Sequence, residues 1–422
     1  MLKSLTVAEE QMLTGLFNPK CFAETLFTEG VPDGWLNGEP CVHIRLYQLP
    51  FLQYDTVIED DNRLTRQQNF DLRKIAGELF VICGRLIGKC EEENQECLLA
   101  SGKMVTFKNL VNKSAKVLVL DETKLKIKKS LAKFFNNGIK ECFELITESG
   151  KITIKTENHP FFTADGWKSL KDLKVGEYIT TPREYPNLGN LKVDKNIAKL
   201  LGYLLGDGSC TTNHIGFTNI NEELLKEYYE LADYFDCSLT KIGIDYFVKR
   251  KIFNSDKNDI YKLVLKYGIN KKSKYKEIPK QVFLWHKDSI AILLNRLFAC
   301  DGHINKTCKH IELTLASKKM IYQIQHLLLR LGIYSSIYEK KATCNGKVFK
   351  AWRLFIIKDF NKFLDVVGIK SKDMGFRKNP KYRIGDNIPQ KLFLNLYNQF
   401  KGFYYHLKLR KMKFSRKKTS RT

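Results

Sequence analysis

The sequence predicts a multi-domain chain with a short α/β fragment, then an incomplete all-β domain, then a duplicated α/β domain with a basic tail. Its 422 residues exceed one ordinary domain. Residues 200–208 (LLGYLLGDG) and 294–302 (LNRLFACDG) are similar segments about ninety residues apart, which indicates a duplication. Charge is also uneven. Residues 1–89 hold nine Lys/Arg against twelve Asp/Glu, whereas the remainder has a net charge of +28, which favours a polyanionic partner such as DNA.

The N-terminal fragment ends in a buried strand and a turn that contains glycine and lysine. Residues 79–82 (LFVI) read as the strand, and residues 83–90 (CGRLIGKC) are close to GxxxxGK[ST]. In that motif Gly88 and Lys89 would contact phosphates. The loop departs from the motif at its first glycine and at Cys90, where a hydroxyl should bind Mg²⁺. Because a thiol is a poor Mg²⁺ ligand, we expect no ATP hydrolysis.

With residues 45–51 (RLYQLPF), which look like an adenine-contacting segment, this loop resembles the start of phage terminase large subunits, the DNA-packaging ATPases. The resemblance covers only residues 1–89, and no Walker B acid follows. It implies a phage or prokaryotic host cell. The eleven cysteines lack CxxC pairs and fit a reducing cytoplasm. The sequence contains no run of eighteen apolar residues, so we expect no membrane span. The alternative to a phosphate loop at residues 83–90 is a strand and turn with incidental glycine and lysine.

The middle of the chain carries a second set of ordered motifs. Residues 150–163 (GKITIKTENHPFFT) contain Thr-x-x-His and are followed by Gly-Trp and by a Val-Gly-Glu turn. Short alternating strands at 141–147 and 151–156 suit an all-β fold. The ordered set resembles block B of inteins, which implies a Hint-like splicing domain. The resemblance implies that Thr156 holds the scissile peptide and that His159 donates a proton to the departing amide nitrogen.

Two cysteines are candidates for the nucleophile that opens such a domain, Cys90 and Cys97. Cys90 fits the family's spacing better, because residues 98–102 (LLASG) follow it as the family's opening strand and turn. A Ser or Thr after the excised segment would also restore the phosphate loop. The Cys90 thiolate would attack the carbonyl of Lys89 and form a thioester. Inteins close on His-Asn, which this chain lacks. A truncated gene, a split intein with a separate C-terminal fragment, and a degenerate relic all stay open.

The duplicated segments predict a pair of helices that pack closely and end in carboxylates. Gly202 and Gly206 share one helix face and permit close backbone approach. Asp207 and Asp301 lie at helix C-termini, where the dipole disfavours negative charge. Two converging carboxylates there require a cation, and oxygen ligands suit Mg²⁺. Such a site fits phosphodiester hydrolysis. Either motif alone would be explained as a buried helix with an Asp-Gly turn.

The segments that follow the two motifs also match. Each Asp-Gly leads into a β-like stretch, at residues 215–218 and 311–315, then into an amphipathic helix, at 222–235 and 318–331, and then into a second β-like stretch. We therefore predict a monomer with an internal pseudo-two-fold axis.

Residues 196–386 resemble the LAGLIDADG, or DOD-type, homing endonucleases. Residues 276–279 (KEIP) look like the family's Lys-x-Ile-Pro block, and Lys276 would stabilise charge on the phosphate. The resemblance implies flanking β-sheets that form a saddle over double-stranded DNA. Arg296 matches Gly202, so we expect the second helix to approach less closely there, which lowers cleavage efficiency.

The predicted parts are residues 1–89 (ATPase fragment), 90–190 (splicing domain), 195–390 (endonuclease) and 391–422 (basic tail). The leading hypothesis is an intein-associated DNA endonuclease that retains the first splicing step. The alternatives are a DNA-binding relic with an inactive nuclease and a fragment of a packaging ATPase.

Overall fold

The computed structural model describes residues 52–58, 93–121, 126–136, 138, 140–163, 166–182, 184–186, 188–211, 214–251, 258–305, 310–344 and 347–372. The predictions for Gly88, Lys89, Cys90 and the tail 391–422 lie outside these residues. No helix in the described ranges is long and apolar enough to cross a membrane.

The described part of region 90–190 is built from strands and two short 3₁₀ turns, as the sequence predicts. The expected strands at 141–147 and 151–156 are present as β6 and β7. The elements are β2 (Glu96–Leu98), β3 (Met104–Thr106), η2 (Phe107–Asn109), β4 (Ser114–Asp121), β5 (Lys126–Lys133), β6 (Phe143–Thr147), β7 (Ile152–Lys155), β8 (Pro160–Thr163), β9 (Gly166–Ser169), η3 (Leu170–Asp172) and β10 (Tyr178–Pro182).

One strand of this region comes from the N-terminal fragment. β1 (Leu52–Ile58) pairs antiparallel with β10 on one side and with β6 on the other. The resulting six-stranded sheet has the order β7-β6-β1-β10-β8-β9. Residues 1–89 were expected to form a separate piece, so this pairing was not predicted.

The rest of the described chain consists of two repeats with the same order of elements. The first repeat contains α4 (Lys195–Leu205), β11 (Gly208–Ser209), β12 (Gly216–Thr218), α5 (Glu222–Tyr234), β13 (Cys237–Ile242), β14 (Asp245–Arg250) and α6 (Asp259–Tyr267). Two 3₁₀ turns, η4 (Ser273–Tyr275) and η5 (Lys280–Leu284), lead to the second. The second repeat contains α7 (Lys287–Asp301), β15 (Gly302–Asn305), β16 (His310–Leu315), α8 (Lys318–Arg330), β17 (Ser336–Cys344), β18 (Lys347–Ile356) and α9 (Phe360–Val366).

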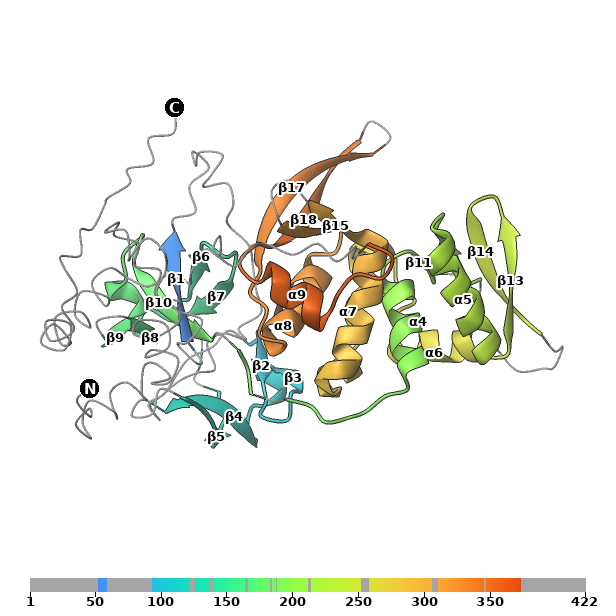
Figure 1. Ribbon diagram of the computed structural model, residues 1–422. Coiled ribbons are helices and arrows are strands. Elements are labelled where there is room, and N and C mark those ends of the chain that lie inside the picture. The colour runs from blue at the N-terminus through green and yellow to red at the C-terminus, as the bar shows by residue number, and fades with distance from the viewer. Residues whose placement is uncertain are drawn as a thin grey trace, which may run out of the picture.

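The predicted duplication is confirmed in the sheets. The first repeat has the strand order β11-β12-β14-β13, and the second has β15-β16-β18-β17. In each repeat the second β-like stretch expected from the sequence is a complete hairpin. α4 and α7 stand side by side between the two hairpins (Figure 1). This arrangement brings the two Asp-Gly segments together.

The equivalent helices α5 and α8 begin through the same local device. The Asn221 side chain accepts a hydrogen bond from the backbone N–H of Leu224, and the Ser317 side chain accepts one from Met320. Such caps satisfy backbone donors that a helix leaves without partners in its first turn. The polar residue that precedes each apolar run therefore determines where each helix starts.

The all-β region docks on the second repeat. Arg330 of α8 donates to the carbonyl oxygen of Gly102 at 2.7 Å. The backbone N–H of Ile337 donates to the carbonyl of Ser149 at 3.1 Å. Buried side chains of both regions belong to one continuous hydrophobic cluster. The all-β region and the second repeat therefore pack as a unit.

Candidate metal and nucleic-acid site

The helix pair α4–α7 is closely packed at both glycines of the first motif. A Cβ atom placed on Gly202 would lie 2.5 Å from the carbonyl oxygen of Leu293 and 2.7 Å from Cβ of Arg296. A Cβ on Gly206 would lie 2.6 Å from Cβ of Cys300. These distances are too short for a side chain, so the prediction that both glycines permit close backbone approach is confirmed.

Arg296 does not keep the helices apart, and our expectation that it would is wrong. Its Cβ faces Gly202 directly, and the remainder of its side chain turns to α5. There Nε and Nη2 donate to the Glu227 carboxylate at 2.8 and 2.7 Å. The glycine on one helix suffices for close approach, because the long side chain leaves the interface.

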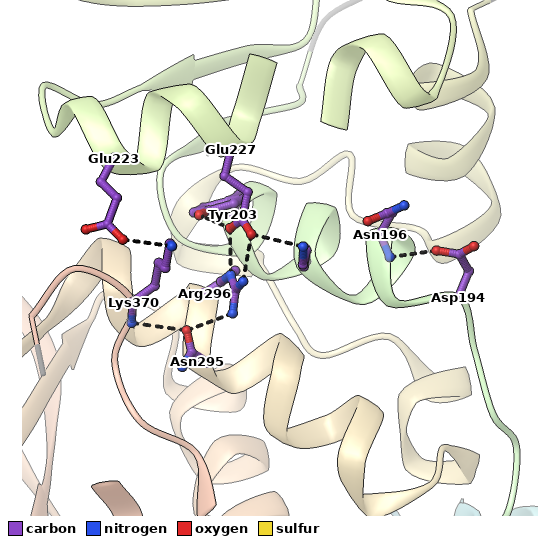
Figure 2. A network of polar contacts seen from close by, with 9 residues as sticks. Asp194, Asn196, Tyr203, Glu223, Glu227, Asn295, Arg296 and Lys370 are labelled. Carbon is purple, nitrogen blue, oxygen red and sulfur yellow. Dashed lines mark hydrogen bonds and ion pairs between the residues drawn. The ribbon is translucent and has the colours of Figure 1, made fainter. Parts of the chain in front are cut away.

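Glu227 is the centre of a polar network that joins the two repeats (Figure 2). Besides Arg296 it accepts from the Tyr203 hydroxyl at 2.6 Å and pairs with Lys199 at 3.0 Å. Burial alone would raise the pKa of Glu227, but the hydrogen bonds from Arg296, Tyr203 and Lys199 lower it to about 2. The ionised carboxylate is therefore strongly favoured inside the interface.

A second arm of this network holds the segment that follows α9. Asn295 accepts from the backbone N–H of Lys370 at 3.1 Å and donates to the carbonyl of Val367 at 2.7 Å. The Lys370 ammonium pairs with Glu223 of α5 at 2.7 Å (Figure 2). These contacts fix the chain two residues before Lys372.

The two aspartates lie at equivalent ends of the helix pair, as predicted. Asp301 is the last residue of α7, and Asp207 follows the end of α4. The Asn219 amide donates to Oδ2 of Asp207 at 2.6 Å, and the backbone N–H of Thr218 donates to the Asp207 carbonyl at 3.2 Å. The first repeat's sheet thus orients Asp207.

The electrostatics of this pair indicate that it favours a positive ion. Removal from water and the neighbouring Asp207 carboxylate raise the pKa of Asp301 to about 7, against the lowering effect of Lys276 and Lys372. The Asp301 residue as a whole is nevertheless exposed to solvent. A bound cation would cancel the repulsion between the Asp207 and Asp301 carboxylates, which is one of the two causes that raise the pKa of Asp301. Burial raises the pKa of the neighbouring Cys300 thiol well above its usual value, and a soft sulfur donor suits a hard cation such as Mg²⁺ poorly.

Lys276, predicted to act at the site, lies at the C-terminal end of α4. Its ammonium donates to the carbonyl oxygens of Leu204, Leu205, Gly206 and Gly208 at 2.8 to 3.1 Å. A cation there offsets the negative end of the helix dipole. The pKa of Lys276 is lowered by burial, although the two aspartates and the neighbouring cysteines act in the opposite direction.

Lys372 is the equivalent lysine of the second repeat and was not predicted from the sequence. Its ammonium donates to the carbonyl oxygens of Cys300 and Gly302 at 3.3 and 2.8 Å, at the end of α7. Each repeat therefore places one lysine, from the segment after its last helix, at the C-terminus of its first helix. The order of elements is the signal that could have found it, because Lys276 follows α6 as Lys372 follows α9.

The residues at this centre fit a hard divalent cation. Two carboxylates converge at two helix ends, and their repulsion is the kind that a cation relieves. In the part of the chain that the structure describes, no group of three or more His, Cys, Asp or Glu side chains could hold a metal ion. The centre therefore offers two carboxylates, and any further ligands would be carbonyls, water or substrate oxygens.

The splicing-like motif folds as a turn between β7 and β8. Thr156 and His159 are both buried, and the backbone N–H of His159 donates to the carbonyl of Thr156 at 3.0 Å. Nearby, the Thr153 hydroxyl donates to the Gln95 side chain at 3.3 Å, so the segment that leads into β2 passes beside β7. Cys97, the second candidate nucleophile, is buried within β2.

A family comparison agrees with this geometry. Residues 288–368 match the family described as a LAGLIDADG-like domain. This segment covers most of the second repeat, and the first repeat has the same order of elements. The second repeat is therefore similar to a LAGLIDADG-like domain.

Several curated proteins share a long segment with this chain. Replicative DNA helicase DnaB of Synechocystis sp. is 29% identical over 65% of this chain, and replication factor C small subunit of Methanocaldococcus jannaschii is 29% identical over 71%. Protein RecA of Mycobacterium bovis is 27% identical over 50%. The chain covers only 34%, 16% and 28% of those three proteins.

Solved structures give a weaker likeness. The homing endonuclease I-DmoI in complex with DNA and Mn is 17% identical with a TM-score of 0.30, over 41% of this chain and 96% of that one. The N-terminal LAGLIDADG domain of DUF199/WhiA is 16% identical with a TM-score of 0.27, over 43% and 85%. TM-scores of this size carry no argument about the function of this chain.

Proposed function

We propose that this chain is a divalent-metal-dependent endonuclease that cuts double-stranded DNA, embedded in an intein. The observation that carries the proposal is the convergence of Asp207 and Asp301 at the ends of two glycine-packed helices, each end also capped by a lysine. A merely structural helix pair does not need two carboxylates where both helix dipoles oppose them.

Asp207 and Asp301 would hold the metal, and Mg²⁺ is the expected ion because both ligands are carboxylate oxygens. The bound ion would polarise the scissile phosphate and supply the charge that phosphodiester hydrolysis requires. Asn219 would keep Asp207 oriented. Lys276 and Lys372 hold positive charge at both helix ends, which would stabilise the additional negative charge of the phosphate.

The two sheets would bind the DNA on either side of this centre. Strands β13, β14, β17 and β18 carry lysines and arginines, which would contact phosphates. Binding should weaken steeply with salt. The internal pseudo-two-fold axis would let one monomer contact both halves of a target.

Cutting of a plasmid that carries the uninterrupted host gene tests this function. With Mg²⁺ the protein should nick or linearise the plasmid, and with EDTA it should not. The alternative is a DNA-binding relic. Tight binding in Ca²⁺, without cutting in Mg²⁺ or Mn²⁺, would favour that alternative over the nuclease.

The intein part of the proposal rests on the turn that contains Thr156 and His159. Its support is the contact between Thr153 and Gln95, which brings the chain just after Cys90 beside this turn. The relatives add a second argument. Proteins whose names denote a helicase, a replication factor and RecA each match this chain over about a third of their length or less, which supports a module that proteins of different activities carry.

In the first splicing step the Cys90 sulfur would attack the carbonyl carbon of Lys89. The bond from that carbon to the Cys90 nitrogen breaks, and His159 gives the nitrogen its proton, so a thioester and a free amine form. Thr156 would hold the scissile peptide. Completion would need a His-Asn end, which residues 1–422 do not contain. Residues 1–89 would then be the host segment, a terminase-like phage ATPase.

Dithiothreitol should release a fragment that ends at Lys89, because thiol exchange intercepts the thioester. Cys90→Ala should stop this release, and Cys142→Ala, an exposed cysteine, is the matched control. Mass spectrometry distinguishes the start sites, since a fragment that ends at Glu96 would assign the nucleophile to Cys97. A folded protein that releases no thiol-dependent fragment would show that the splicing half is inert.

A further inference from the structure

The strand registers align the two sheets residue by residue. Gly208 pairs with Phe217 in the first repeat, as Gly302 pairs with Leu313 in the second. Continuing across each sheet makes Thr218 equivalent to Thr314. On the next strand of each sheet, Thr218 pairs with Asp245 and Thr314 pairs with Arg353, so Asp245 and Arg353 are also equivalent.

These residues lie on the sheet face that points away from the helices. Leu313, Leu354 and Ile337 are fully buried and pair with one another across the second sheet, so they form its core face. Because side chains alternate along a strand, Thr314 and Arg353 lie on the opposite face. Phe217 and Tyr246 mark the core face of the first sheet in the same way.

The row of outward-facing residues, Thr218 and Asp245 in the first sheet and Thr314 and Arg353 in the second, begins next to the candidate metal centre. In the first repeat the backbone N–H of Thr218 donates to the carbonyl of Asp207. In the second repeat Asp301 directly precedes Gly302, which pairs with Leu313, the residue before Thr314. Arg353 and Asp245 are two strands away from the aspartates. That separation is about 10 Å, or roughly three base-pair steps along DNA.

Arg353 is held in a fixed orientation by two neighbours. Its Nε donates to the Thr314 hydroxyl at 3.0 Å, and its Nη1 lies 3.1 Å from the Glu312 carboxylate. A quarter of its side chain, 27%, remains accessible. In the first repeat the equivalent Asp245 carboxylate accepts from the Thr218 hydroxyl. The same position therefore presents a donor in one sheet and an acceptor in the other.

We propose that Arg353 and Asp245 read bases at equivalent positions of the two half-sites and make the DNA target non-palindromic there. The inference rests on the proposed binding of DNA by these sheets. Arginine donates two hydrogen bonds to O6 and N7 of guanine, whereas a carboxylate accepts from the amino group of cytosine. Arg353 specifies guanine in the half-site of the second repeat. Asp245 specifies a base with an amino group, cytosine or adenine, at the symmetric position.

The contacts of Arg353 are compatible with this reading. Its two intramolecular bonds use Nε and one N–H of Nη1, so a guanine would take Nη2 and the second N–H of Nη1. A cross-strand ion pair at a partly exposed site contributes little stability by itself. The fixed orientation instead lowers the conformational entropy lost when the side chain binds a base.

A randomised double-stranded DNA library, bound to the full chain in Ca²⁺ and sequenced, tests the assignment. The parent should enrich guanine at one position and an amino-bearing base at its symmetric counterpart. Arg353→Ala should lower the guanine preference about ten- to hundredfold in that half-site alone. Arg353→Lys, which keeps the charge without the fork, should lose the same preference while it retains non-specific binding.

Asp245→Ala should affect only the other half-site. Lys350→Ala is the control: this exposed lysine of the same hairpin would contact phosphate, so its loss should weaken binding without altering the base preference of either half-site. If the Arg353 variants enrich the same bases as the parent, or if both variants alter one half-site, the assignment is overturned. A parent that binds DNA without any enrichment overturns the base reading and leaves a non-specific DNA binder. A parent that binds no DNA overturns the proposed function as well.

Discussion

Breaking the Arg296–Glu227 pair should cost more stability than breaking an exposed ion pair of the described residues, although Arg296 departs from the glycine of the first motif. The two side chains are 13% and 11% exposed, and Arg296 makes two hydrogen bonds of 2.8 and 2.7 Å to the carboxylate. Removal of one partner from a buried pair costs about 3–5 kcal/mol, because the other charge is left without compensation.

We expect Arg296→Ala to cost about 3 kcal/mol, the low end of that range, since Tyr203 and Lys199 still contact Glu227. The double variant Arg296→Ala/Glu227→Gln should recover much of the loss, because no buried charge is then stranded. Urea unfolding, followed by circular dichroism, measures both changes.

Lys370→Ala is the matched control, since it breaks a pair with Glu223 whose side chains are 31% and 54% exposed. Its cost should stay below about 1 kcal/mol. A cost for Arg296→Ala as small as that of the control would refute the reasoning, and so would a double variant less stable than the single one.

The same pair predicts a pH dependence with a definite sign. The pKa of Glu227 is lowered to about 2 in the folded protein from 4.5. Its contribution to stability is therefore present above pH 4.5 and lost as the pH falls toward 2. Over this window the parent should lose more stability than Glu227→Gln. Parallel acid-unfolding curves for the two proteins would contradict the assignment.

Three further predictions follow from the site and the sequence. Because the pKa of Asp301 is raised to about 7, the Mg²⁺ concentration for half-maximal cleavage should rise about tenfold per pH unit below that value; a constant requirement from pH 6 to 8 would contradict this. Lys276→Ala and Lys372→Ala should both slow cleavage, whereas the exposed Lys274→Ala should not; equal rates for all three would remove the lysines from the site. Purified protein should show no ATP turnover, because a thiol stands where the phosphate loop needs a hydroxyl; turnover that disappears on Lys89→Ala would overturn this.

The duplication and the helix pair could be predicted because their signals are local. Helical periodicity, the cap before each amphipathic helix and the spacing of Gly202 and Gly206 all lie within short segments. The positions of Asp207 and Asp301 follow directly, since each is attached to the end of a predicted helix.

Partners that are distant in sequence could not be predicted in this way. Glu227 is 69 residues from Arg296, and only the tertiary packing of α5 on α4 and α7 reveals why an arginine is tolerated opposite a glycine. Lys372 lies beyond any motif and reaches the site because α9 folds back on α7. The pairing of β1 with β6 and β10 is also non-local, and strand pairing at this separation has no short-range sequence signal.

Cleavage and binding by Asp207→Asn and Asp301→Asn test the central claim most directly. Each variant should abolish Mg²⁺-dependent cutting of the target and should largely retain DNA binding, because the neutral amide keeps the shape but not the charge that holds the metal. Asp288→Asn, an exposed aspartate in the first turn of α7, should cut at the rate of the parent. If both site variants also cut at that rate, Asp207 and Asp301 do not hold a catalytic metal and the proposed active site is wrong.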